Sequence, residues 1–215
     1  VLFRSVSEAT RTATFTPGRD AARKEASKLN VPRIGVRFRL PASMNQVEYF
    51  GRGPAENYLD RNAGSMVGLY KSTAEELYFP YVRPQENGHH TDTRWVSLST
   101  GKKGLLIQAD NTIGFNALRN SIEDFDDEEA TGLSRQWSNF TPEQVANHDE
   151  AAAKNVLRRQ HHINDITPRD FVEVCVDLKQ QGVAGYDSWG SRPEPAYTLP
   201  ANREYNWGFT LIPLK

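Results

Sequence analysis

The sequence of 215 residues is poor in cysteine, in net charge and in long apolar runs. Its single cysteine, Cys175, excludes a disulfide within the chain and leaves the redox compartment open. A net charge of −1 provides no basic field that would attract nucleic acid or anionic lipid. No apolar run approaches the roughly 20 residues that a membrane helix requires. We therefore expect neither a nucleic-acid partner nor a membrane partner.

The N-terminus lacks a basic region followed by a long apolar stretch, so we expect no signal peptide. The chain starts as if inside a strand, which is typical of a fragment of a longer protein. Residues 1–30 are polar and contain a turn signal at residues 17–20. We expect a partial or peripheral segment there.

Alternating apolar and polar residues predict strands, because successive side chains of a strand point to opposite faces. The clearest alternation runs over residues 33–40. Its apolar face consists of Ile34, Val36, Phe38 and Leu40. The opposite face carries three arginines, Arg33, Arg37 and Arg39, and Pro41 ends the strand.

Similar patterns predict further strands at residues 47–50, 94–98, 105–109, 172–178 and 205–214. The second and third of these form a hairpin. The fourth alternates valine and leucine with acidic residues and the cysteine, which predicts a half-buried strand with the thiol in the core.

Helix signals are few. A threonine cap, a proline at the first helical position and a boxed glutamine predict a helix over residues 142–159. A shorter turn is predicted to begin at Ser72, with Glu75 in the boxed position. The acidic run at residues 124–129 is typical of a solvated loop. The predicted fold class is all-β, a sandwich of antiparallel sheets with one or two short helices.

Three loops carry the residue types that bind sugars: residues 50–61, 80–90 and 182–190. Trp189, in the third loop, offers a flat apolar face on which the C–H bonds of galactose stack, while carboxylates and amides bind the hydroxyls. The alternative is structural. A loop tryptophan fills the core more often than it forms a sugar platform, and polar loop residues usually satisfy backbone groups or form ion pairs.

No catalytic or metal-binding residue can be nominated from the residues themselves. The pairs His89–His90 and His161–His162 lack ligand spacing, since neighbours on a strand point to opposite faces. Glycoside hydrolysis needs two carboxylates about 5–9.5 Å apart, and no pair is singled out by spacing. We therefore predict no cofactor in this chain.

From about residue 32 to the C-terminus, the sequence resembles the C-terminal domain of the glycoside hydrolase family two β-galactosidases. Their "GxGPxENYxDR" loop is matched by Gly51, Gly53, Pro54, Glu56, Asn57, Tyr58, Asp60 and Arg61. Their "Y-PYxxPxENG…TR" segment is matched by Tyr78, Pro80, Tyr81, Pro84, Glu86, Asn87, Gly88, Thr93 and Arg94. Residues 159–166 and 176–190 resemble the closing segments of that domain. The resemblance implies that residues 1–215 form one such domain.

The resemblance further implies a galactose mutarotase-like supersandwich, in which a preceding barrel supplies the two catalytic glutamates. The chain would be a non-catalytic part of a retaining β-galactosidase, inactive alone. Trp189 would be the sugar platform, with Asp187 and Ser188 positioning its loop. A loop bordering the active site would comprise Pro84, Gln85, Glu86, Asn87, Gly88, His89 and His90.

The implied partners are a galactoside substrate, the barrel domain and, in the parent enzyme, further copies of itself. Related enzymes use magnesium and sodium near the barrel, but no ligand can be named here. The compartment would be the bacterial cytoplasm or periplasm.

Two departures from the family stand out: residues 183–186 replace part of a glycine run, and residues 119–147 form a predicted insertion. Two other functions stay open. One is a stand-alone carbohydrate-binding module. The other is an aldose mutarotase, which needs a glutamate base and a histidine acid facing one sugar.

Overall fold

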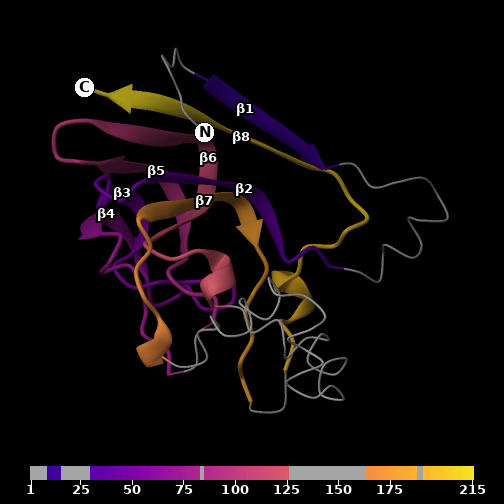
Figure 1. Cartoon of the computed structure of the whole chain (residues 1–215). Helices are drawn as coiled ribbons and strands as arrows, with labels where there is room; N and C mark the ends of the chain where they lie inside the picture. The colour runs from indigo at the N-terminus through magenta and orange to yellow at the C-terminus, as the bar shows by residue number, and fades with distance from the viewer. Residues whose placement is uncertain (1–8, 16–29, 83–84, 126–162, 188–190) are drawn as a thin grey trace, which may run out of the picture. The chain divides into compact units, whose positions relative to one another are not determined.

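The computed structural model describes residues 9–15, 30–82, 85–125, 163–187 and 191–215 (Figure 1). The chain divides into two compact units. The first unit comprises Val1–Tyr78, Asn87–Arg119 and Asp170–Lys215. The second comprises Phe79–Glu86 and Asn120–Arg169.

The described part of the first unit is built from strands and one 3-10 turn. The strands are β1 (Ala9–Phe15), β2 (Arg33–Pro41), β3 (Gln46–Gly53), β4 (Met66–Thr73), β5 (His90–Ser99), β6 (Gly104–Leu118), β7 (Phe171–Gln180) and β8 (Tyr205–Leu214). The turn is η4 (Pro195–Tyr197). All seven strand pairings are antiparallel, so the predicted all-β antiparallel class is confirmed.

Strand β6 holds the unit together, because it pairs with three other strands (Figure 1). Its first half, Gly104–Ala109, pairs with β8, and its last part, Gly114–Leu118, pairs with β7. Strand β5 pairs with both parts. One edge of β6 is therefore shared in succession by β8 and β7. The main path of the sheet is β1-β8-β6-β5-β3-β4, and β7, followed by β2, branches from β6 at the edge that β8 also uses.

The core fills the inward face of these strands with branched and aromatic side chains. Its fully buried members include Val96, Leu98, Ile107, Ala117, Val172, Val174 and Val176. At its centre the ring of Phe115 lies 5.0 Å from the ring of Tyr49 and 5.1 Å from that of His90, both in edge-on arrangements. Such contacts add to the free energy of burying the rings.

The predicted arginine face of β2 is confirmed, and it explains an error in the prediction for β7. That strand is buried on both faces over residues 172–177, whereas we predicted a half-buried strand. Arg33 donates from Nε to Asp177 at 2.9 Å, and Arg39 donates to Glu173 at 3.0 Å. Because the neighbouring strand supplies these cations, the two carboxylates can leave water. Cys175 is buried, as predicted.

Other expectations need correction. Strand β1 was missed, because its sequence of threonine, alanine and arginine has no apolar alternation. The predicted capping turn begins one residue later. The N–H of Thr73 donates to Glu76 at 3.0 Å, and the N–H of Glu76 donates back to Thr73 Oγ1 at 3.2 Å. Glu75 instead accepts a hydrogen bond from Arg119 at 2.6 Å.

In the second unit, the described residues form two short 3-10 turns, η1 (Ile122–Asp124) and η3 (Ile163–Asp165). Asp124 is buried and ion-paired with Arg169, so the acidic run does not begin as the solvated loop we predicted. The predicted helix over residues 142–159 and most of the predicted insertion lie outside the described residues.

Replacing Phe115 with alanine tests whether the centre of the sheet is the main source of stability. The side chain is 0% exposed, so the substitution leaves a cavity and should cost about 3–5 kcal/mol in free energy of unfolding. The measurement is urea denaturation of the 215-residue chain followed by circular dichroism.

The matched control is Leu69→Ala on β4. That leucine is 59% exposed, so the change should stay within about 0.5 kcal/mol of wild type. Similar losses in both variants would contradict the assignment of the core.

Candidate functional site: a loop joined to two distant segments

The loop after β3 begins where two glycines of that strand, Gly51 and Gly53, have neighbours that leave no space for a side chain. A Cβ on Gly51 would lie 2.4 Å from Thr93 Oγ1, and a Cβ on Gly53 would lie 2.3 Å from the hydroxyl of Tyr49. These approaches are too close for any side chain. The loop therefore packs directly against β5 and the core, which fixes where residues 54–61 begin.

Asn57 is the buried centre of this loop, with 0% exposure. Its side-chain NH₂ donates to the carbonyls of Arg52 and Ala55, at 3.1 Å each. Its Oδ1 accepts from the N–H of Thr91 at 3.0 Å and from the hydroxyl of Thr91 at 2.5 Å. Its own N–H donates to the carbonyl of His89 at 2.7 Å. One side chain thus closes its own loop and binds the start of β5.

Glu56 makes a second connection between the same two segments. Its carboxylate accepts a hydrogen bond from the N–H of Gly88 at 2.5 Å and is ion-paired with Arg61. The guanidinium of Arg61 also lies over the ring of Tyr58, 4.8 Å from its centroid. The carboxylate is 5% exposed, so both hydrogen bonds are largely shielded from water.

Asp60 connects the loop to a third segment, after β7. Its carboxylate accepts hydrogen bonds from the N–H of Val183 at 3.1 Å and from that of Ala184 at 2.7 Å. This segment leads to the predicted sugar-binding residues. Of those, Asp187 is exposed and accepts from the N–H of Ser191 at 3.3 Å, while Ser188 and Trp189 lie outside the described residues.

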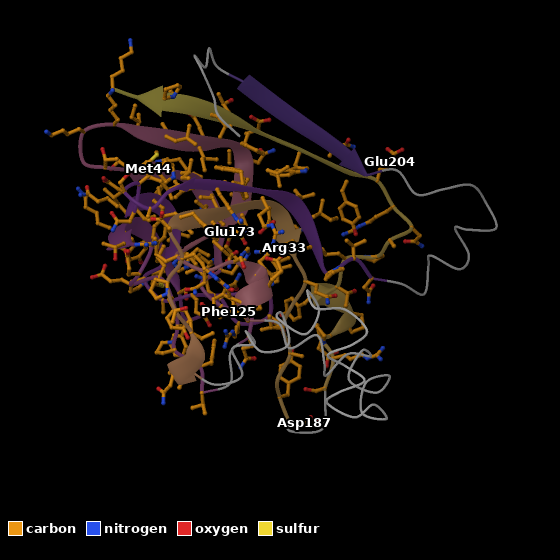
Figure 2. The ribbon with its side chains drawn as sticks, viewed as in Figure 1. Arg33, Met44, Phe125, Glu173, Asp187 and Glu204 are labelled. Carbon is orange, nitrogen blue, oxygen red and sulfur yellow. The ribbon has the colours of Figure 1, made fainter. Side chains whose placement is uncertain are left out.

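Asp187 lies apart from the buried ion pairs of the sheet (Figure 2). Figure 2 shows Asp187 well away from Arg33 and Glu173 of the β2–β7 pair. Four residues of the predicted bordering loop are buried, Asn87, Gly88, His89 and His90. Gln85 is exposed and Glu86 is half-buried, and Pro84 lies outside the described residues.

The two buried histidines belong to different environments. The ring of His89 donates from Nδ1 to Asn116 at 2.8 Å and stacks on Tyr58. The ring of His90 donates from Nδ1 to the carbonyl of His89 at 3.0 Å and stacks on Tyr49. Within the described part of the chain, Nε2 of His90 has no hydrogen-bond partner.

Burial favours the neutral form of both rings. It lowers the pKa of His90 to about 3. Burial, and then the positive charge of Arg33, lower the pKa of His89 to about 3, against the opposing effect of the hydrogen bond that the ring donates to Asn116. Both histidines are therefore structural at neutral pH, and neither is exposed as a proton donor.

Within the residues described, no group of three histidine, cysteine or acidic side chains could hold a metal ion. Over the same residues, no helix has the length and apolarity to cross a membrane.

Comparison with known proteins matches this chain to a part of proteins that are named β-galactosidase. The match to the family described as "Beta galactosidase small chain" covers residues 4–211, and the chain belongs to that family.

Three relatives illustrate the similarity. The chain is 35% identical over 185 residues to a β-galactosidase of Priestia megaterium, covering 86% of this chain and 15% of that enzyme. It is 40% identical over 111 residues to one of an Arthrobacter species, covering 49% of this chain and 11% of that enzyme. It is 29% identical over 181 residues to one of Vibrio cholerae, covering 84% and 14%. The chain thus spans about 15% of the length of such relatives.

Residue types alone had suggested that these loops bind sugar, but not which residues hold them in place. The roles of Asn57, Glu56 and Asp60 depend on distant partners, 32 to 124 residues away in the sequence, and no local pattern marks such pairs.

The buried histidines predict a loss of stability in mild acid. Their pKa values are about 3 in the folded chain and about 6.5 when unfolded, so the unfolded chain binds protons first as the pH falls. The free energy of unfolding should keep its full value above about pH 6.5. At lower pH it should decrease by up to about 1.4 kcal/mol per pH unit for each ring. Urea denaturation at several pH values measures this.

Carboxylates also titrate in acid, so the comparison must be with a variant. His90→Phe suits the aromatic surroundings of Tyr49 and Phe115 and removes one titrating ring. Between pH 6.5 and 4.5 its stability should fall less steeply than that of wild type, by up to about 1.4 kcal/mol per unit. Parallel curves would contradict the assignment.

Proposed function

We propose that this chain is the non-catalytic domain of a retaining β-galactosidase that cleaves terminal β-galactosides such as lactose. The observation that carries the proposal is the family match over residues 4–211, together with a span of only 15% of a matched enzyme. The remainder of such an enzyme would supply the barrel and its two glutamates, and the assembled enzyme would be an oligomer.

In this proposal, the loop after β7 contributes to the sugar subsite. Trp189 stacks on the galactose ring, and Asp187 and Ser188 shape the turn that presents it. The exposure of Asp187 supports an accessible loop. Of the predicted bordering loop, Asn87, Gly88, His89 and His90 are buried, which supports a structural role for these four residues.

The described carboxylates of β7 are poor candidates for catalysis by this chain. A retaining enzyme needs two carboxyl groups about 5–5.5 Å apart that reach the substrate. Glu173 is 2% exposed and Asp177 is 1% exposed, and both are ion-paired with arginines of β2. They support a structural role.

A mutarotase is the weaker alternative, because its histidine acid must reach the sugar. His89 and His90 are each 1% exposed, and the other histidines lie outside the described residues. A stand-alone carbohydrate-binding module differs from the proposal in that it would bind galactose without the rest of the enzyme.

The first test is an assay of the isolated chain. We expect no hydrolysis of o-nitrophenyl β-galactoside, no interconversion of galactose anomers by NMR, and at most weak galactose binding by tryptophan fluorescence. Turnover would contradict the proposal. Micromolar affinity for galactose would favour the module, and anomer exchange would favour the mutarotase.

The second test is Trp189→Ala in the complete enzyme that contains this chain. Loss of the stacking ring should raise KM for galactosides by roughly tenfold or more, since base- or sugar-stacking aromatics contribute on the order of 1–3 kcal/mol. Trp95→Phe, on β5, is the matched control and should leave KM unchanged. An unchanged KM in Trp189→Ala would contradict a sugar platform.

A further inference from the structure

Asp60 is placed to control the loop that follows β7. It lies in the loop after β3, yet its two carboxylate oxygens accept hydrogen bonds from two successive backbone N–H groups, those of Val183 and Ala184. The bond lengths are 3.1 and 2.7 Å. Converging backbone N–H groups form a site for an anion, and here the anion is a side chain of the same protein.

The conformation of the loop fits this contact. Ala184 has a φ of +55° and Gly185 a φ of +87°, so two successive residues are left-handed. For alanine this conformation is strained and persists only where other contacts hold it. The hydrogen bond to Asp60 is made by the N–H of that same alanine, so the carboxylate holds the strained residue in place.

Gly182 shows how closely the carboxylate and the loop approach. A Cβ on this buried glycine would lie 2.6 Å from both Cγ and Oδ2 of Asp60. Its N–H donates to the carbonyl of Tyr197 at 2.8 Å, which ties the base of the loop to η4. Residues 182–184 are thus held from two sides.

Beyond this base, hydrogen bonds join the described residues Tyr186 and Asp187 to Ser191. The N–H of Tyr186 donates to Ser191 Oγ at 3.1 Å, and the N–H of Ser191 donates to Asp187 at 3.3 Å. These bonds hold residues 186–187 close to residue 191. The direction in which the chain leaves Ala184 therefore determines where residues 186–187 and residue 191 lie.

We infer that Asp60 is a positioning residue for galactoside binding, because it fixes the base of the loop that presents the sugar-binding residues. The inference rests on the proposed function. It also gives the loop after β3 a role in the site. Asn57 and Glu56 bind that loop to the start of β5 and to the residues just before it, and Asp60 then holds the loop after β7 in place. An asparagine could not replace Asp60, because one of its side-chain atoms is a donor that would face a donor N–H.

The experiment is steady-state kinetics of the complete enzyme carrying Asp60→Asn, with o-nitrophenyl β-galactoside. We expect KM to rise by roughly tenfold, since charge-assisted hydrogen bonds are lost, and kcat to change much less. Asp110→Asn, an exposed carboxylate on β6, is the matched control and should change neither constant. Equal constants for Asp60→Asn and wild type would overturn the inference.

A double-mutant cycle with Trp189→Ala shows whether Asp60 acts through the loop. If it does, Asp60→Asn raises KM much less in the Trp189→Ala background than in wild type. Additive effects would overturn the inference. If Trp189→Ala alone leaves KM unchanged, the proposed function fails. If it raises KM and Asp60→Asn does not, only the inference fails.

Two further measurements keep the test decisive if Asp60→Asn folds poorly. Gly182→Ala places a methyl group against the carboxylate and should raise KM in the same way. In the isolated chain, hydrogen exchange at the amides of Val183 and Ala184 should be at least about tenfold faster in Asp60→Asn than in wild type, because both amides lose an acceptor. Unchanged exchange would show that the carboxylate does not hold the loop.

Discussion

Burying a polar group without a partner is costly, and this constraint shapes the protein more than any single apolar contact. Asn57 is fully buried and can be so only because its amide and backbone bond with Arg52, Ala55, His89 and Thr91. Removing any one partner would leave a buried donor or acceptor unsatisfied. The loop after β3 can therefore keep this conformation only when the start of β5 is also in place.

The same constraint acts on the two carboxylates of β7. Asp177 and Glu173 leave water because β2 lies alongside and presents Arg33, Arg37 and Arg39 on one face. Arg33 reaches further, to Asn116, which in turn binds His89. Strands β2, β6 and β7 and the segment before β5 are thus connected by hydrogen bonds as well as by the sheet. This network fixes the segment to which the loop of Asn57 is attached.

The local sequence pattern was sufficient to predict a strand and its two faces where burial alternates along the strand. The alternation in residues 33–40 correctly predicted both the strand and its arginine face, since a period of two is a property of the strand itself. It failed for β1, which has no apolar alternation, and for β7, whose second face is buried only because β2 supplies cations. The loops were identifiable by composition and by family resemblance, but their partners were not.

In the candidate site, too, some features are visible in the local sequence and others depend on contacts between distant residues. A tryptophan in a glycine-rich loop is visible in the sequence, whereas the carboxylate that holds the base of that loop lies 124 residues away from Ala184. A loop residue in a left-handed conformation is strained unless another part of the structure imposes it. Asp60 supplies that restraint from a segment that is itself held by buried hydrogen bonds. The position of the loop after β7 is therefore determined by the core of the sandwich, through two successive sets of hydrogen bonds.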